Sequence, residues 1–294
     1  MTRPILVAVS PESADRGPVN FAVAAGRFTG ASLVLLTVGG DAAAGASLES
    51  ELGSRGVTAT VRAEENGSPA HALARAVEQL APALVVVGST HRGKLGRVLL
   101  GTTADRVMHG SPCPVVVVPR GHEVHADRVR AVGAAFLPTA EGRETLEMAA
   151  RLARSAGARL EAVMVLSPKH AEAQSPGMMA HAHHDSDAAE DITARDHLGA
   201  EDALREALAS SAADLGVEPD ILFQDHADGL IAASERLDLL VMGSAPHGPA
   251  GAVALGGVAR KVTASAGCPV LVLPRDAKAQ IAALLPHTAP PAAQ

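Results

Sequence analysis

An internal repeat runs through the chain, so any fold it adopts has to exist in two copies. Residues 83–119 recur without a gap as residues 238–274. The clearest matches there, each 155 positions apart, are Gly88 with Gly243, Gly101 with Gly256, Cys113 with Cys268 and Pro119 with Pro274. Nearer the start of each copy the spacing is 127 positions, as between Gly30 and Gly157. We therefore predict one domain written twice, over residues 1–121 and 128–275.

The spacing between matched positions changes along the chain, which places an insert in the second copy. Gly56 matches Gly216, 160 positions later. The second copy has therefore gained 33 residues after its second predicted strand, and we place this insert at about 167–197. Residues 276–294 are rich in Ala and Pro, which predicts a frayed helix or a disordered tail.

Short apolar runs alternate with Ala/Arg/Glu-rich stretches in both copies. The runs consist almost entirely of Val, Leu and Ile, as in parallel strands covered on both faces. In the first copy the predicted strands are 5–9, 32–38, 57–61, 84–87 and 115–118, and the predicted helices are 19–28, 44–54, 71–79 and 103–109. In the second copy the predicted strands are 129–136, 160–165, 220–223, 239–242 and 270–273. This alternation predicts an α/β protein with two tandem doubly wound parallel sheets of Rossmann-like type.

Charge and composition exclude several classes of partner. The formal net charge is −7, Tyr and Trp are absent and only four Phe occur, which argues against nucleic-acid binding. No apolar run reaches the roughly 18 residues of a membrane span, and the N-terminus lacks a signal-peptide pattern, so we expect a cytoplasmic protein. Cys113 and Cys268 occupy matched positions beside Pro, and we interpret both as small buried apolar residues.

The loop after the fourth predicted strand is the best candidate for a ligand site. Ligands of open α/β sheets bind beyond the carboxyl ends of the strands, which is where this loop begins. It contains glycines at 88, 93, 96 and 101, and hydroxyl groups at Thr102 and Thr103, where the next helix is predicted to begin. Arg92, Lys94 and Arg97 add positive charge. Glycines, a helix N-terminus and cations together favour binding of a polyphosphate.

This loop resembles the ATP-binding loop of the universal stress protein family. The family pattern is glycine, two residues, glycine, nine residues, glycine, then serine or threonine. Gly88, Gly101 and Thr102 match it, whereas His91 stands at the second glycine. The resemblance extends over nearly all of residues 1–120 and 128–276. It implies a fold of the adenine-nucleotide alpha-hydrolase-like type.

The resemblance also implies a set of contacts to ATP. An aspartate that ends the first strand in ATP-binding members is replaced here by Ser10. Val38 matches the family's backbone contact to adenine. The implied nucleotide-binding residues are Ala8, Val9, Ser10, Val38, Gly88, Thr90, His91, Arg92, Gly101, Thr102 and Thr103. The fifth strands of the two copies, 114–119 and 269–274, are expected to pair and form an internal pseudo-dimer, because each would otherwise leave an apolar sheet edge exposed.

The second copy of the loop is less suited to phosphate. Pro246 replaces the second glycine and removes an amide donor, and Gly257 replaces the hydroxyl residue. No Lys or Arg occurs between Gly243 and Ala259. We predict that this second site is structural and empty. Neither copy contains the Gly-Lys-Ser/Thr of a hydrolytic P-loop or a G-x-G-x-x-G after its first strand.

Histidines gather in the predicted insert. Residues 181–187 read His-Ala-His-His-Asp-Ser-Asp, a composition that can bind Zn, Cu or Ni. A specific site also needs a rigid scaffold around the ligands, so we favour a solvated insert that binds metals only weakly.

Three interpretations of function follow from the sequence. The first is a stress-response regulator that binds ATP or a related adenine nucleotide in its first half and hydrolyses it slowly or not at all. The second is a nucleotide-free scaffold whose partners are proteins, and the changes at Ser10 and His91 support it. The third, an enzyme that uses His91 as an acid or base, lacks a partner group in the sequence. A further homodimer is compatible with all three.

Overall fold

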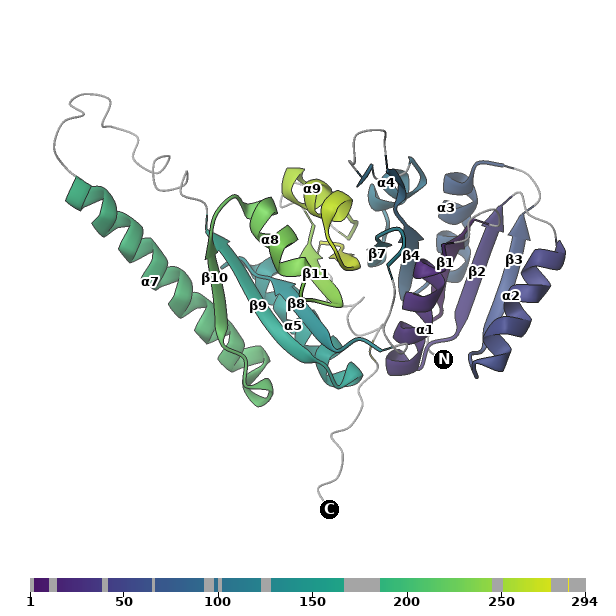
Figure 1. Ribbon diagram of the computed structural model, residues 1–294, viewed down its shortest axis with the longest axis horizontal. Helices are drawn as coiled ribbons and strands as arrows, with labels where there is room; N and C mark the ends of the chain where they lie inside the picture. Colours follow the sequence, from purple (N-terminus) through teal and green to yellow (C-terminus); the bar gives the residue numbers. More distant parts are fainter. Residues whose placement is uncertain are drawn as a thin grey trace, which may run out of the picture.

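Ten strands form one continuous sheet through both halves of the molecule (Figure 1). The computed structural model describes residues 3–10, 15–38, 42–64, 67–92, 98–99, 102–122, 128–166, 186–244, 251–275 and 285. The strand order across the sheet is β10-β9-β8-β11-β12-β7-β4-β1-β2-β3. The first half contributes one side of this sheet and the second half the other.

Each half is a doubly wound parallel sheet, as predicted. The strands of the first half are β1 (Ile5–Val9), β2 (Leu33–Val38), β3 (Ala59–Glu64), β4 (Leu84–Gly88) and β7 (Val115–Val118). Those of the second are β8 (Ala131–Ala135), β9 (Arg159–Leu166), β10 (Pro219–Phe223), β11 (Leu239–Gly243) and β12 (Val270–Leu273). Both follow the order third, second, first, fourth, fifth, with parallel neighbours. The central strands are buried on both faces, which explains their unbroken Val, Leu and Ile character.

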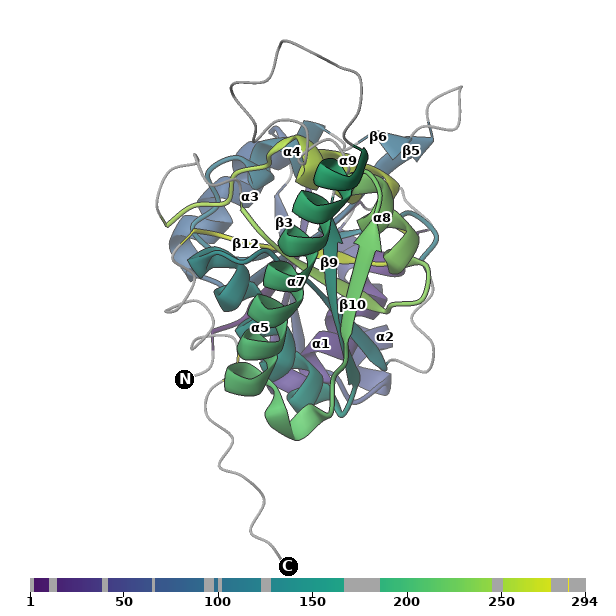
Figure 2. The same cartoon turned by 90° about the vertical axis from the view of Figure 1, so that its left-hand side faces the viewer.

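Helices cover both faces of the sheet. In the first half they are α1 (Gly17–Thr29), α2 (Ala42–Ser54), α3 (Pro69–Leu80) and α4 (Thr102–Met108). In the second they are α5 (Ala140–Ala156), α7 (Ser186–Ser211), α8 (His226–Ser234) and α9 (Gly257–Ser265), with a short 3-10 turn at Ala213–Leu215. Side chains of α1, α2, α5 and α7 pack on one face, and those of α3, α4, α8 and α9 on the other. Figure 2 shows α7 beside β10 at the end of the sheet.

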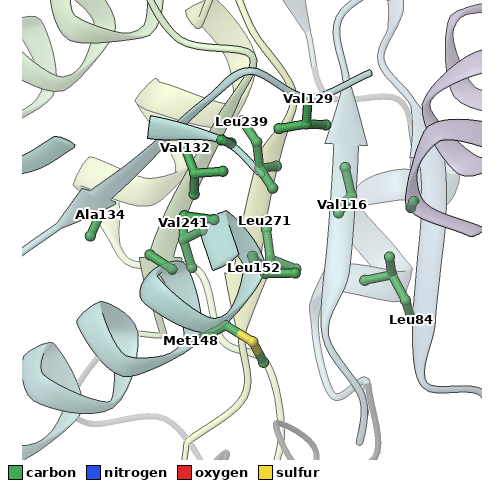
Figure 3. Close-up of a cluster of buried hydrophobic side chains, with 14 of the residues drawn as sticks. Leu84, Val116, Val129, Val132, Ala134, Met148, Leu152, Leu239, Val241 and Leu271 are labelled. Atoms are coloured by element: carbon green, nitrogen blue, oxygen red, sulfur yellow. The ribbon is translucent and has the colours of Figure 1, made fainter. Parts of the chain in front are cut away.

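The fifth strands join the two halves, and this confirms the predicted pairing. β7 and β12 are antiparallel, with Val116 opposite Leu271. Because these two positions are equivalent in the repeat, the pairing is symmetric about them, as in a two-fold dimer interface. Figure 3 shows Val116 and Leu271 within an apolar cluster that takes side chains from both halves. The chain therefore forms an internal pseudo-dimer with a shared core.

The structure differs from the sequence-based expectation in three places. The predicted loop after β4 contains two short antiparallel strands, β5 (Thr90–Arg92) and β6 (Val98–Leu99). The last part of the predicted insert, from residue 186, belongs to α7, while His181, His183 and His184 lie outside the described residues. Leu285, in the predicted tail, is buried against the core. In the described part of the chain, no helix is both long and apolar enough to cross a membrane.

Candidate functional site

A cavity of about 280 Å³ opens at the point where the strand order of the first half reverses. β1 pairs with β2 on one side and with β4 on the other, so the order in which the strands are added reverses its direction beside β1. This is the general ligand position of open α/β sheets. The residues that line it are Ala8, Val9, Ser10, Asp15, Pro18, Val19, Leu36, Val38, Pro69, Val87, Gly88, Ser89 and Ala104.

Five of the residues predicted to bind nucleotide line this cavity together. Ala8, Val9 and Ser10 end β1, Val38 ends β2 and Gly88 ends β4. Parallel strands bring these carboxyl ends to one edge of the sheet, although up to 80 residues separate them in the chain. The remaining predicted residues are not placed in the cavity. Gly101 lies outside the described residues, and the side chains of Thr90, His91, Arg92, Thr102 and Thr103 are also outside the described part.

The end of β4 is held close to the first helix. A Cβ atom at Gly88 would lie 3.1 Å from the Cγ of Pro18, so a larger residue would require the Pro18 ring to shift slightly. The neighbouring Ser89 hydroxyl accepts a hydrogen bond of 3.0 Å from the amide of Arg120, and the Ser89 amide donates to the carbonyl of Val118 at 2.8 Å. These contacts tie the cavity wall to the residues that follow β7.

Asp15 is a charged lining residue that the sequence analysis did not predict. Its carboxylate accepts hydrogen bonds from the amides of Gly17, at 3.0 Å, and Gly121, at 3.4 Å. It lies just before α1 and lines the same cavity as Ser10. An acidic residue shortly before a predicted helix was a usable signal, since such residues often bind the free amides at a helix start. The first cavity therefore has an acidic lining residue, although Ser10 replaces the aspartate of the family pattern.

The second half has a cavity of its own in the equivalent place, of about 290 Å³. It lies at the carboxyl ends of β8 and β11, between the starts of α5, α8 and α9. The residues that line it are Ala135, Phe136, Leu137, Thr139, Glu141, Gly142, Thr145, Val163, Val165, His226, Leu230, Met242, Gly243, Ser244, Gly256, Gly257, Val258 and Ala259. The sequence analysis had predicted no ligand there and did not anticipate an open cavity.

The two cavities are built from matched positions of the repeat, and they differ in polarity. Several lining residues are identical at matched positions, as are Ala8 and Ala135 or Gly88 and Gly243. At two positions where the first cavity has a polar side chain, the matched residue of the second cavity is apolar or has no side chain. The changed pairs are Ser10 with Leu137 and Asp15 with Gly142. The second cavity has polar residues of its own, but larger apolar side chains such as Leu137, Leu230 and Met242 also line it.

Both cysteines are buried and free, as expected from their places in the repeat. Burial raises the pKa of Cys113 and of Cys268. A raised pKa keeps the sulfur in the unreactive thiol form at neutral pH. Within the described residues no group of three or more His, Cys, Asp or Glu could hold a metal ion. The histidines of the insert fall outside that range.

Comparison with known proteins shows similarity to one family in both halves. The model of the Universal stress protein family matches residues 40–119 and 130–274. Universal stress proteins of Mycobacterium tuberculosis and Mycobacterium bovis are each 28% identical over 212 residues, covering 67% of this chain. The chain spans 66% of the length of these relatives.

Solved structures show the same fold over almost the whole chain. A putative universal stress protein from Pseudomonas aeruginosa is 21% identical, with a TM-score of 0.69 and 96% of each chain covered. A universal stress protein from Archaeoglobus fulgidus is 18% identical, with a TM-score of 0.59 and coverage of 92% of this chain and 98% of the other. The cytoplasmic domain of a prokaryotic cation chloride cotransporter is 14% identical, with a TM-score of 0.53, and covers 97% of this chain and 100% of its own. The fold is therefore shared by proteins of different kinds.

Proposed function

The chain belongs to the universal stress protein family, and we propose that it is a stress-response regulator that binds ATP or another adenine nucleotide in its first half. The observation that carries this proposal is the cavity at the end of β1 and β4. Five residues that the family resemblance assigns to nucleotide binding line it, and they come from three separate strands. Binding at this edge of the sheet is typical of nucleotide-binding α/β proteins.

The first cavity offers different chemistry to the two ends of a nucleotide. Apolar walls at Ala8, Val9 and Val38 suit a base, while the Ser10 hydroxyl and the Asp15 carboxylate can accept hydrogen bonds from ribose hydroxyls. The chain continues from Gly88 into a segment whose sequence contains three cations, at 92, 94 and 97. Charge-assisted hydrogen bonds from such groups are the usual means of holding phosphates.

We expect a binding role in the cytoplasm, acting on protein partners, with ATP hydrolysis slow at most. Catalysis would need a base that is free to take a proton from water. Asp15 is the carboxylate that lines the first cavity, and both of its oxygens accept amide hydrogen bonds that anchor the start of α1. This arrangement suits a group that positions a ligand better than one that exchanges protons.

Native mass spectrometry of the purified chain tests the proposal. We expect a co-purified or added adenine nucleotide at one per chain, lost in Ala8→Phe because the larger side chain fills the first cavity. Ala135→Phe is the matched control, since it makes the same change at the equivalent position of the second cavity. If Ala8→Phe folds and still binds ATP as the unaltered chain does, the nucleotide lies elsewhere. If the unaltered chain binds none at millimolar ATP, the nucleotide-free scaffold is the better account.

A further inference from the structure

We infer that the cavity of the second half is a binding site for an uncharged, mainly apolar small molecule with one hydrogen-bond acceptor. The cavity, of about 290 Å³, is close to the lower end of the range of small-molecule sites. It is present although the sequence around it has lost the features of a phosphate site. The inference does not depend on whether the first cavity binds a nucleotide.

Apolar side chains form most of the wall of this cavity. Its lining includes the buried side chains of Val163, Leu230 and Met242. At its rim Leu137 is 51% exposed and Val258 is 40% exposed, two of the large apolar side chains that remain exposed in the described part of the chain. A ligand that covered them would remove apolar surface from water, which contributes about 25 cal/mol per Å². The wall therefore favours an apolar ligand.

The hydroxyl groups of the cavity already have partners within the protein. Thr139 accepts from the amide of Gly142 at 3.1 Å, and Thr145 donates to the carbonyl of Glu141 at 2.8 Å. Ser244 donates to the carbonyl of Leu273 at 2.6 Å and accepts from an amide as well. Thr145 and Ser244 thus use their hydroxyl hydrogens inside the protein, whereas Thr139 accepts and can still donate its hydroxyl hydrogen to an acceptor of a ligand.

Electrostatics disfavour a phosphate or another anion in this cavity. The acidic residue Glu141 is part of its wall. The sequence supplies no Lys or Arg from Gly243 to Ala259, and the next two cations are already paired, Arg260 with Asp105 and Lys261 with Asp228, each at 2.7 Å. Desolvating an anion without a partner of opposite charge is costly. The described lining residues of the second cavity include no Lys or Arg that would pair with a triphosphate.

The start of α9 offers further donors to a ligand with an acceptor. The starts of α5 and α8 are capped by the side chains of Thr139 and Asp225. α9 also begins at the cavity, but its N-cap is Gly256, which makes no side-chain hydrogen bond. The first amides of a helix have no partner inside the helix. A carbonyl or ether oxygen of the ligand can accept from them, whereas a cation would meet the positive end of the helix dipole.

Fluorescence titration of the full chain with Prodan, an uncharged naphthalene dye that has a carbonyl acceptor and brightens in apolar sites, tests this inference. We expect saturable binding at one site per chain, and no displacement by ATP. Gly257→Phe is the first blocking variant, since a Cβ there meets no atom within 4 Å and the ring can enter the cavity without strain on the fold. We expect it to weaken dye binding by about tenfold or more.

Two further variants separate the cavities. Ala135→Phe is expected to weaken dye binding as Gly257→Phe does, while Ala8→Phe, at the equivalent position of the first half, is expected to leave it unchanged. Thermal melts followed by circular dichroism check that each variant is folded. The inference is overturned if the unaltered chain shows no saturable binding, if the folded Gly257→Phe variant binds the dye unchanged, or if ATP displaces the dye.

Discussion

Single residues set the difference between the two cavities, because the backbone around them is nearly the same. Ser10 and Asp15 give the first cavity a hydroxyl and a carboxylate, and the equivalent Leu137 and Gly142 give the second neither. At these two matched positions the repeat thus exchanges polar groups for an apolar side chain and a glycine. The rest of the wall keeps the cavity open in both halves.

Another residue-scale feature is the ion pair between α5 and the 3-10 turn that follows α7. The Nε of Arg154 lies 2.8 Å from Oδ2 of Asp214, and its Nη2 donates to the carbonyl of Ser211. The hydrogen bond from Arg154 lowers the pKa of Asp214 to about 2. The folded protein therefore holds the proton of the Asp214 carboxyl group less tightly than the unfolded chain does. For this reason the ion pair stabilises the fold at pH values above the ordinary aspartate pKa. Its contribution is lost as the pH falls toward 2.

We predict that Arg154→Met returns the pKa of Asp214 toward its ordinary value. Carbon-detected NMR titration of the carboxyl group measures it directly. Asp225 is the internal control, because its pKa is lowered by the backbone amide of Asp228 and not by Arg154. A pKa that remains near 2 in the variant would show that another group stabilises the carboxylate.

At the scale of elements, the start of α5 packs unusually close to the turn after β8. Gly142 lies in the first turn of α5, and a Cβ there would be 1.9 Å from the carbonyl oxygen of Leu137. Backbone atoms cannot move aside as a flexible side chain can. This contact fixes the position of the α5 N-terminus, which forms one wall of the second cavity.

We therefore predict that Gly142→Ala destabilises the protein, even though alanine favours helices. Overpacking typically costs about 1–3 kcal/mol, which exceeds the gain in helix propensity of about 1 kcal/mol. Gly199→Ala is the matched control: it lies inside α7, and its Cβ would meet no atom within 4 Å. There we expect a stabilisation of about 0.5–1 kcal/mol. Urea unfolding measures both, and a neutral Gly142→Ala would contradict this packing.

At the scale of the whole molecule, the two halves behave as one body because their fifth strands share a core. Val116 and Leu271 face each other across the junction and are both buried. Beyond the sheet, Arg260 of α9 pairs with Asp105 of α4 at 2.7 Å, and the amide of Gly110 donates to the carbonyl of Val253. The interface between the two halves is thus held by the shared sheet and by polar contacts between helices and loops beside it.

The fold could be predicted well because the repeat and the buried apolar runs are both visible as patterns in the amino-acid sequence. The sequence did not predict β5, since Thr90–Arg92 has no apolar alternation and pairs only because the chain folds back on itself. It missed Asp15 because this residue matches no position of the family pattern, although an acidic residue before a predicted helix was a usable signal. The second cavity was not predicted for a different reason. The loop after β11 was considered only as a phosphate-binding loop, whereas a cavity can exist without phosphate-binding residues.

Equilibrium dialysis with labelled ATP counts the nucleotide sites and so tests the divergence of the two halves directly. The first half keeps Ser10, Asp15 and a cationic segment after Gly88, whereas the described lining of the second cavity contains no Lys or Arg and its loop sequence from Gly243 to Ala259 has none. Loss of several charge-assisted hydrogen bonds, at about 1.5–3 kcal/mol each, weakens a site by orders of magnitude. We predict saturation at one ATP per chain, abolished by Ala8→Phe and retained in Ala135→Phe. Saturation at two ATP per chain, or loss of binding only in Ala135→Phe, would contradict this account.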